Sequence, residues 1–142
     1  NISAYIESLP LQPATPSVVG DVARGEELYL TCSACHGAQG EGKYATSSPR
    51  LAGQDDWYMV RQLENFKTMT RGGDRRDMMG PQMALIAKMF RDEEDMRDVV
   101  AYINTLPAPT AQTAQVESAE RVAPVETAQA VQDEVVVAGA GE

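Results

Sequence analysis

The stretch Cys32-Ser33-Ala34-Cys35-His36 decides how this chain folds and what it binds. Its two thiols stand three positions apart, so one helical turn places both on the same side of a helix. His36 follows the second thiol directly and adds an imidazole. Two such thiols can each add to a vinyl group of one porphyrin while the imidazole points at the iron. The pentapeptide therefore predicts covalent attachment of one haem c.

Other uses of the two cysteines fit the sequence less well. A structural zinc site needs four ligands, whereas the chain holds two Cys and one His in all. A thioredoxin-like Cys-x-x-Cys belongs to a βαβ pattern, and no segment here alternates like a strand. A disulfide between cysteines so close in sequence is disfavoured by geometry.

Charge and hydropathy exclude two classes of partner. The chain has 142 residues and a formal net charge of −9. Positions 21–106 carry fourteen acidic and eleven basic residues, so they offer no basic face, and we expect no nucleic-acid partner. No run of about 18 apolar residues predicts a transmembrane segment. The chain begins with Asn and shows no signal peptide, which predicts a processed or excised piece.

The chain divides into four segments by composition. Residues 1–10 (NISAYIESLP) match residues 98–107 (DVVAYINTLP) in register, so we expect 1–10 to be the remnant of the last helix of a preceding haem domain. Chance similarity between two amphipathic helix ends is the alternative. Residues 11–20, with two prolines and a glycine, predict a linker before the domain at 21–107. Residues 108–142 form an acidic, low-complexity tail without aromatics, predicted to be disordered or to dock on a partner.

The domain is patterned for helices. They are expected at 21–31, from Asp55 or Asp56 to about Lys67, at 84–90, and from Asp92 to the stop before Pro107. Asp95 occupies the capping-box position of the last helix, and residues 37–53 predict a loop. About 85 residues is small for a self-sufficient core, so a covalently bound apolar macrocycle would supply much of it.

A second protein ligand would close the iron to small molecules and favour electron transfer. The sequence has no further His, so a Met sulfur is the best candidate. Met59 and Met96 fall inside predicted helices, where core packing is the commoner role, and Met89, beside Phe90 at the start of the last helix, is expected to pack. Met69 follows the second helix directly, too early for a loop that must cross the far face of the haem. Three candidates remain around the Gly80-Pro81 turn: Met78, Met79 and Met83.

The domain resembles bacterial class I c-type cytochromes, nearest to the c4, c5 and c553-like groups and to haem domains fused to oxidase subunits. The resemblance implies an all-α fold of about four helices wrapped around one covalent haem c. Gly25 and Tyr29 match the crossing of the first and last helices, with Val99 and Tyr102 opposite. Six motifs carry the likeness across the domain: Gly25-Glu-Glu-Leu-Tyr29, Cys32-Ser-Ala-Cys-His36-Gly37, Pro49-Arg-Leu-Ala-Gly53-Gln54, Arg61-Gln62-Leu63, Gln82-Met83-Ala84 and Asp98-Val-Val-Ala-Tyr102-Ile103.

Residue roles follow from the resemblance. In this family the ligand Met commonly precedes Ala in a string leading into the last helix, which implies Met83 as the axial ligand opposite His36, with Met79 as runner-up. The Pro49 carbonyl is implied to accept the His36 ring N–H and fix its orientation. The remaining implied haem contacts are Leu51, Trp57, Tyr58 and Arg61. For Trp57 and Tyr58, packing in the protein core explains the residue type equally well.

The expected function is single-electron carriage by a six-coordinate His/Met haem c in a bacterial respiratory chain, without an enzyme activity of its own. The expected partners are a redox donor and acceptor, such as a terminal oxidase or a quinol-oxidising complex, and another haem domain upstream. The alternative is a catalytic haem subunit, peroxidase-like or oxidising sulfur compounds; such sites need a distal acid–base residue, usually His. Because the family's haem is attached outside the cytoplasm, we expect a periplasmic protein, free or membrane-tethered through sequence outside this chain.

Overall fold

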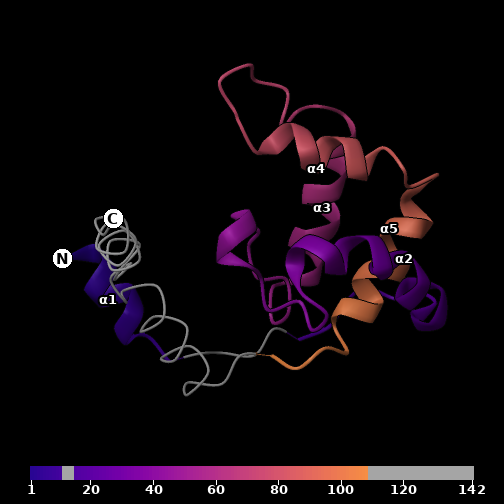
Figure 1. The fold of residues 1–142 in the computed structure, drawn as a ribbon. Coiled ribbons are helices and arrows are strands. Elements are labelled where there is room, and N and C mark those ends of the chain that lie inside the picture. Colours follow the sequence, from indigo (N-terminus) through magenta and orange to yellow (C-terminus); the bar gives the residue numbers. More distant parts are fainter. Residues whose placement is uncertain (11–14, 109–142) are drawn as a thin grey trace, which may run out of the picture. The chain divides into compact units, whose positions relative to one another are not determined.

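The structure is a computed structural model and describes residues 1–10 and 15–108. The described part is helical and holds no strand beyond the isolated bridge between Lys43 and Ser48, which confirms the predicted all-α class (Figure 1). None of its helices is long and apolar enough to cross a bilayer. The predicted tail lies outside the described residues, apart from its first position. In order, the helices are α1 (Ile2–Ser8), α2 (Val22–His36), the 3-10 helix η1 (Tyr44–Thr46), α3 (Asp56–Lys67), α4 (Gly80–Ala87) and α5 (Glu93–Ile103).

Helices α2 and α5 cross in direct backbone contact at Gly25. A Cβ atom at this position would overlap the carbonyl of Asp98 on α5, so only glycine allows the approach. One turn further along α2, the ring of Tyr29 packs against that of Tyr102 with centroids 5.3 Å apart. Val99 completes the contact and is almost fully buried. The predicted crossing of the first and last helices of the domain is confirmed.

A buried carboxylate ties the polar edge of this crossing together. The Oδ1 atom of Asp95 on α5 lies 2.5 Å from Arg24 on α2 and 2.8 Å from Arg91, and its side chain is 3% exposed. The hydrogen bonds from Arg91, opposed by burial and aided by Arg24, hold the pKa of Asp95 well below its usual range. The ionised carboxylate is therefore satisfied by two guanidinium groups, which a buried charge requires.

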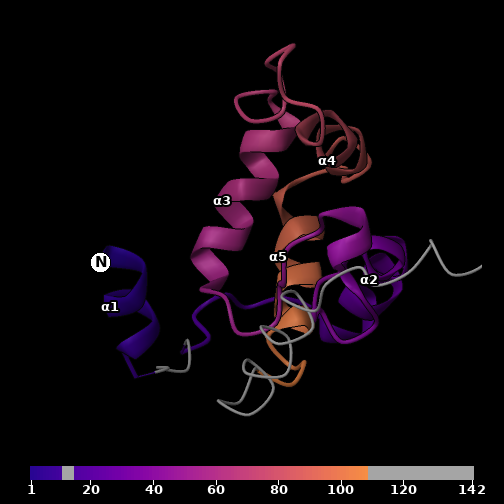
Figure 2. The same cartoon turned by 60° about the vertical axis from the view of Figure 1, so that its left-hand side comes forward.

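Helix α3 joins two separate apolar clusters. Met59 and Val60, in its first half, belong to the larger cluster with α2 and α5, and Phe66, near its end, belongs to a smaller one with Ala84 and Ala87 of α4. Figures 1 and 2 show α4 at one end of α3 and the α2–α5 pair toward the other. The domain thus buries its apolar surface in two places along one helix.

Several helix boundaries and two caps differ from the sequence prediction. Helix α2 continues through Cys-x-x-Cys-His to His36. Helix α4 covers Gly80–Ala87 rather than 84–90, since Pro81 fits the first turn of a helix, and α5 ends at Ile103, before the predicted stop. Asp92 caps α5 by accepting from the Asp95 amide, as predicted, but the Asp95 side chain binds the two arginines and forms no capping box. Asp55 precedes α3, yet its side chain makes no capping hydrogen bond.

Replacing Gly25 by Ala tests the crossing. Alanine has the higher helix propensity by about 1 kcal/mol, so a free helix would gain stability. Because the added methyl group overlaps the Asp98 carbonyl, we expect a net loss of about 1–3 kcal/mol in the free energy of unfolding, measured by denaturant titration. The control Glu26→Ala, exposed on the same helix, should change it by less than about 0.5 kcal/mol. A stabilised G25A protein would contradict the close contact.

Candidate functional site

The last turn and a half of α2 carries the three residues of the attachment motif. Cys32 is half-buried, Cys35 is exposed, and no disulfide joins them. Burial raises the pKa of the Cys32 thiol to about 11, and the neighbouring Cys35 adds to the rise. His36 ends the helix and is 5% exposed. One helix therefore presents two cysteine sulfurs and an imidazole within five residues, the donor set that a covalently tethered haem requires.

The His36 ring is oriented by the backbone of the following loop. Its Nδ1 atom lies 2.7 Å from the carbonyl oxygen of Pro49, so this nitrogen carries the proton and donates it. The other ring nitrogen, Nε2, keeps its lone pair for a metal. This is the geometry that the predicted role of Pro49 needs, with the carbonyl fixing both the tautomer and the ring angle.

The loop itself is held against the end of α2. The Gly42 amide donates to the His36 carbonyl over 2.7 Å, and the Lys43 ammonium donates to the carbonyl of Ala34 over 2.9 Å. The Thr46 hydroxyl lies 3.2 Å from the Cys35 carbonyl oxygen. Carbonyls left open at the helix end thus gain partners from residues 42–46. The same loop brings Pro49 back to the His36 ring.

Tyr29 adds a contact that the sequence analysis did not foresee. Its hydroxyl donates to the Gly37 carbonyl over 2.7 Å, and the side chain is 2% exposed. Gly37 directly follows His36 and takes φ +87°, in the region that favours glycine. Burial, helped by the Cys32 thiol and Glu41, raises the pKa of Tyr29 to about 12. The phenol therefore stays protonated and anchors the residue next to the imidazole.

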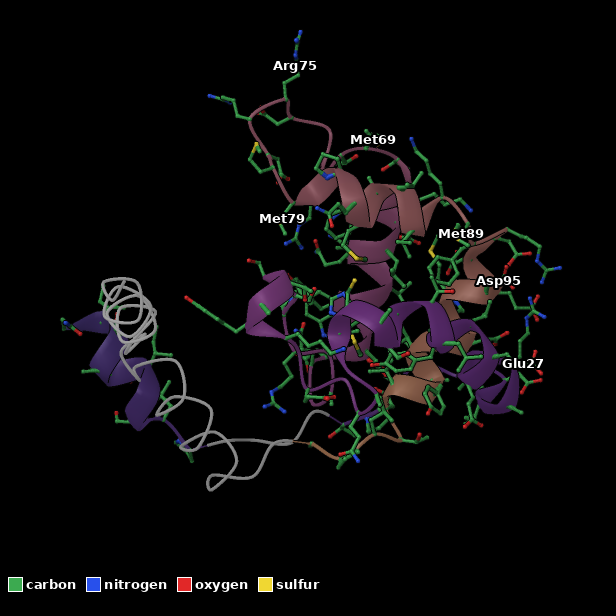
Figure 3. The ribbon with its side chains drawn as sticks, in the orientation of Figure 1. Glu27, Met69, Arg75, Met79, Met89 and Asp95 are labelled. Atoms are coloured by element: carbon green, nitrogen blue, oxygen red, sulfur yellow. The ribbon has the colours of Figure 1, made fainter. Side chains whose placement is uncertain are left out.

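The methionines separate by burial. Met59 and Met96 are core residues, as predicted, whereas Met89 is 65% exposed and lines a cavity together with Leu28, Cys32 and Phe90. Met83 lies in the first half of α4, partly buried against the small cluster. Met79 immediately precedes α4 and is 43% exposed (Figure 3). The second axial ligand stays a prediction, with Met83 ahead of Met79.

The other predicted haem contacts are spread over the loop and α3. Leu51 is half-buried and packs on the large cluster. Trp57 and Tyr58 sit edge to face with centroids 6.0 Å apart, and Trp57 is 58% exposed, so core packing does not account for it. Arg61 lies on the same helix and is exposed. These four residues stay predictions as haem contacts.

The helical fold and the attachment motif agree with the comparisons to known proteins. The cytochrome c family model matches residues 22–107, and the chain belongs to the cytochrome c family. The family binds haem c covalently through the cysteine pair, here Cys32 and Cys35, and carries electrons between redox partners. The bacterial class I resemblance and the fold predicted from it are confirmed.

Three relatives show that similar domains occur in proteins of different total length. The chain is 33% identical over 108 residues to the thiosulfate dehydrogenase electron acceptor of Stutzerimonas stutzeri, covering 76% of this chain and 46% of that protein. It is 33% identical over 86 residues to cytochrome c-554(548) of Halomonas halodenitrificans, covering 61% and 96%. The solved cytochrome c4 of Acidithiobacillus ferrooxidans aligns with TM-score 0.54 and 30% identity, covering 70% and 56%. The chain therefore spans about half of two longer relatives.

Replacing Tyr29 by Phe tests the anchor at Gly37. The change removes the phenol donor from a buried carbonyl that also accepts from the Gly40 amide over 3.2 Å. We therefore expect the loss of one hydrogen bond, about 0.5–1.5 kcal/mol in the free energy of unfolding at neutral pH. Because folding raises the pKa of this phenol from 10.0 to about 12, its stabilisation is complete below pH 10 and is lost as the pH rises to 12. The stability difference between the wild type and Y29F should therefore shrink over that interval. The exposed Tyr44→Phe serves as control, and a difference that is constant from pH 8 to about pH 12 would contradict this role.

Proposed function

We propose that this chain is a single-electron carrier in a bacterial respiratory chain, with His36 and Met83 as the axial ligands of its haem. The observation that carries the proposal is the orientation of the His36 ring. This residue lies at the end of α2, directly after the two cysteines, and its Nδ1 donates a hydrogen bond to the Pro49 carbonyl. A haem ligated by His and Met cycles between Fe(III) and Fe(II), and the thioether favours the reduced state. The protein contributes ligation, orientation and burial.

The absence of a second His from the sequence supports a carrier rather than a catalyst. The sequence holds one His, and it is committed to the attachment motif. A peroxidase-like or sulfur-oxidising haem needs a positioned group to move protons on its open side. The relative from Stutzerimonas stutzeri is named as an electron acceptor of thiosulfate dehydrogenase. That name supports a redox enzyme as donor; a terminal oxidase or a quinol-oxidising complex is the other partner class we propose.

The visible spectrum of the purified protein tests the ligand set. We expect a low-spin c-type spectrum, with the weak long-wavelength sulfur-to-iron band, that carbon monoxide leaves unchanged in the reduced form. Met83→Ala should lose this band and bind carbon monoxide, because the iron would then be open on one side. Met79→Ala is the matched control and should keep the wild-type spectrum. Loss of the band in M79A alone would instead make Met79 the ligand, and a high-spin, carbon-monoxide-sensitive wild type would favour the catalytic alternative.

We further propose that α1 is the last helix of an upstream haem domain. Its apolar side chains Ile2 and Ile6 are 78% and 60% exposed, whereas their counterparts in the repeat, Val99 and Ile103 of α5, are 1% and 4% exposed. In α5 this face packs against α2. Within residues 1–10 and 15–108, no helix is seen to cover the similar exposed face of α1, and a preceding domain of the same fold would supply such a partner.

The gene provides a direct check of this domain organisation. We expect the reading frame upstream of Asn1 to encode a second Cys-x-x-Cys-His. The sequence of α1 matches that of α5, and α5 is the last helix of the haem domain, so a helix of this sequence should follow a complete domain. A signal peptide further upstream would accord with the periplasmic location that we propose. A signal peptide that ends directly before Asn1 would contradict the upstream domain and leave the carrier function untouched.

A further inference from the structure

A buried carboxylate at the start of α3 binds the segment that leads into the domain. Asp56 is 2% exposed, and its carboxylate accepts hydrogen bonds from the backbone amides of Ser17 and Val18, the latter over 2.6 Å. It also accepts from the Ser17 hydroxyl over 2.8 Å. Hydrogen bonds to an ionised acceptor are about twice as strong as neutral ones, so these three donors hold residues 17 and 18 firmly.

The same carboxylate has two further neutral donors. It accepts from the Trp57 amide over 2.7 Å and from the Asn104 side-chain amide over 3.3 Å. Burial alone would raise the pKa of Asp56, but the hydrogen bonds from Val18, Ser17 and Trp57 lower it to about 2. The group is therefore charged at neutral pH and joins the incoming segment, the start of α3 and the end of α5.

The incoming segment is fixed at its other end as well. The Asp21 amide donates to Oδ1 of Asp98 on α5 over 2.7 Å. Gly20 lies so close to α5 that a Cβ atom there would be 2.8 Å from the Arg97 carbonyl oxygen. Val18 packs on the large apolar cluster between these two attachments. Residues 17–21 are thus part of the folded domain rather than a free connection.

We propose that Asp56 acts as a clasp that fixes where the chain enters the haem domain, so that residues 17–21 move with the domain. The tether to anything upstream then shrinks to the stretch between Pro10 and Ser17. Seven residue steps span at most about 25 Å, whereas the twelve steps from Pro10 to Val22 would span about 43 Å. A shorter tether raises the effective concentration of one module at the other.

The consequence for an upstream haem domain rests on the domain organisation proposed above, whereas the clasp itself does not. If residues 1–10 end a second domain, the clasp keeps that domain close to this one and limits the positions from which electrons can pass between the two haems. If no such domain exists, the clasp still orders residues 17–21, and there is no upstream domain for it to position.

Hydrogen–deuterium exchange of the haem-loaded full chain, read by mass spectrometry, tests the clasp. We expect the peptide 15–21 to exchange slowly in the wild type and at least about tenfold faster in Asp56→Asn, because the charged acceptor of its amides is gone. Asp55→Asn is the matched control: this neighbour is exposed and makes no capping hydrogen bond, so the rate should be unchanged. Peptide 96–103 of α5 reports global unfolding and should keep its rate in both variants.

Ser17→Ala keeps the experiment decisive if D56N loosens the whole domain. It removes one hydroxyl donor and leaves the carboxylate in place, so peptide 15–21 should exchange a few-fold faster while peptide 96–103 stays unchanged. Equal exchange of peptide 15–21 in the wild type, D56N and S17A would overturn the clasp. The visible spectrum of each variant should match the wild type, so a failure of the proposed His/Met ligation would appear there and not in the exchange rates.

Discussion

The backbone contact between α2 and α5 is the constraint on which the rest of the domain depends. Because Gly25 has no side chain, α5 lies directly on α2, and the two rings of Tyr29 and Tyr102 fill the space beside the contact. The crossing fixes the axis of α2, and that axis fixes where its final turn presents both thiols and the imidazole. Arg24 and Asp95 close the polar edge of the same contact. The attachment site is thus positioned by a backbone contact about two to three turns away from it.

Around His36 the geometry depends on backbone carbonyls, and this explains which parts of the site the sequence could predict. The motif residues carry their chemistry in their identity and spacing, so the attachment site was predictable. Pro49 was implied by the family resemblance, and its carbonyl does lie beside the ring. The bond from Tyr29 to the Gly37 carbonyl was not predictable, because the path of the loop decides which carbonyl meets the hydroxyl. A periodic apolar pattern predicts that a tyrosine ring is buried, but it does not predict which group accepts the hydrogen bond of its hydroxyl.

The misplaced helix boundaries and the role of Asp56 have a common physical origin. Helix α4 was predicted from its apolar run at 84–90, but Pro81 already suits a first helical turn, and the chain becomes helical from Gly80. At α3, an acidic pair before an apolar stripe predicts a cap. The structure uses Asp56 for a segment 39 residues earlier in the chain, while Asp55 makes no capping bond. Local preferences fix that a helix starts there, and distant backbone donors decide which carboxylate is buried.

The two apolar clusters explain why a domain of this size needs its cofactor. The larger one is formed by α2, α5 and the first half of α3, and the smaller one by the end of α3 with α4. Each is modest, and a domain of fewer than about 100 residues buries a small share of its surface. Cys32 packs on the first cluster and Met83 on the second. Under the ligation proposed above, a macrocycle tethered at Cys32 and ligated by Met83 would connect the two clusters. On that proposal haem attachment would be a step of folding as well as of function, because the group that carries the electron would also unite the two parts of the core.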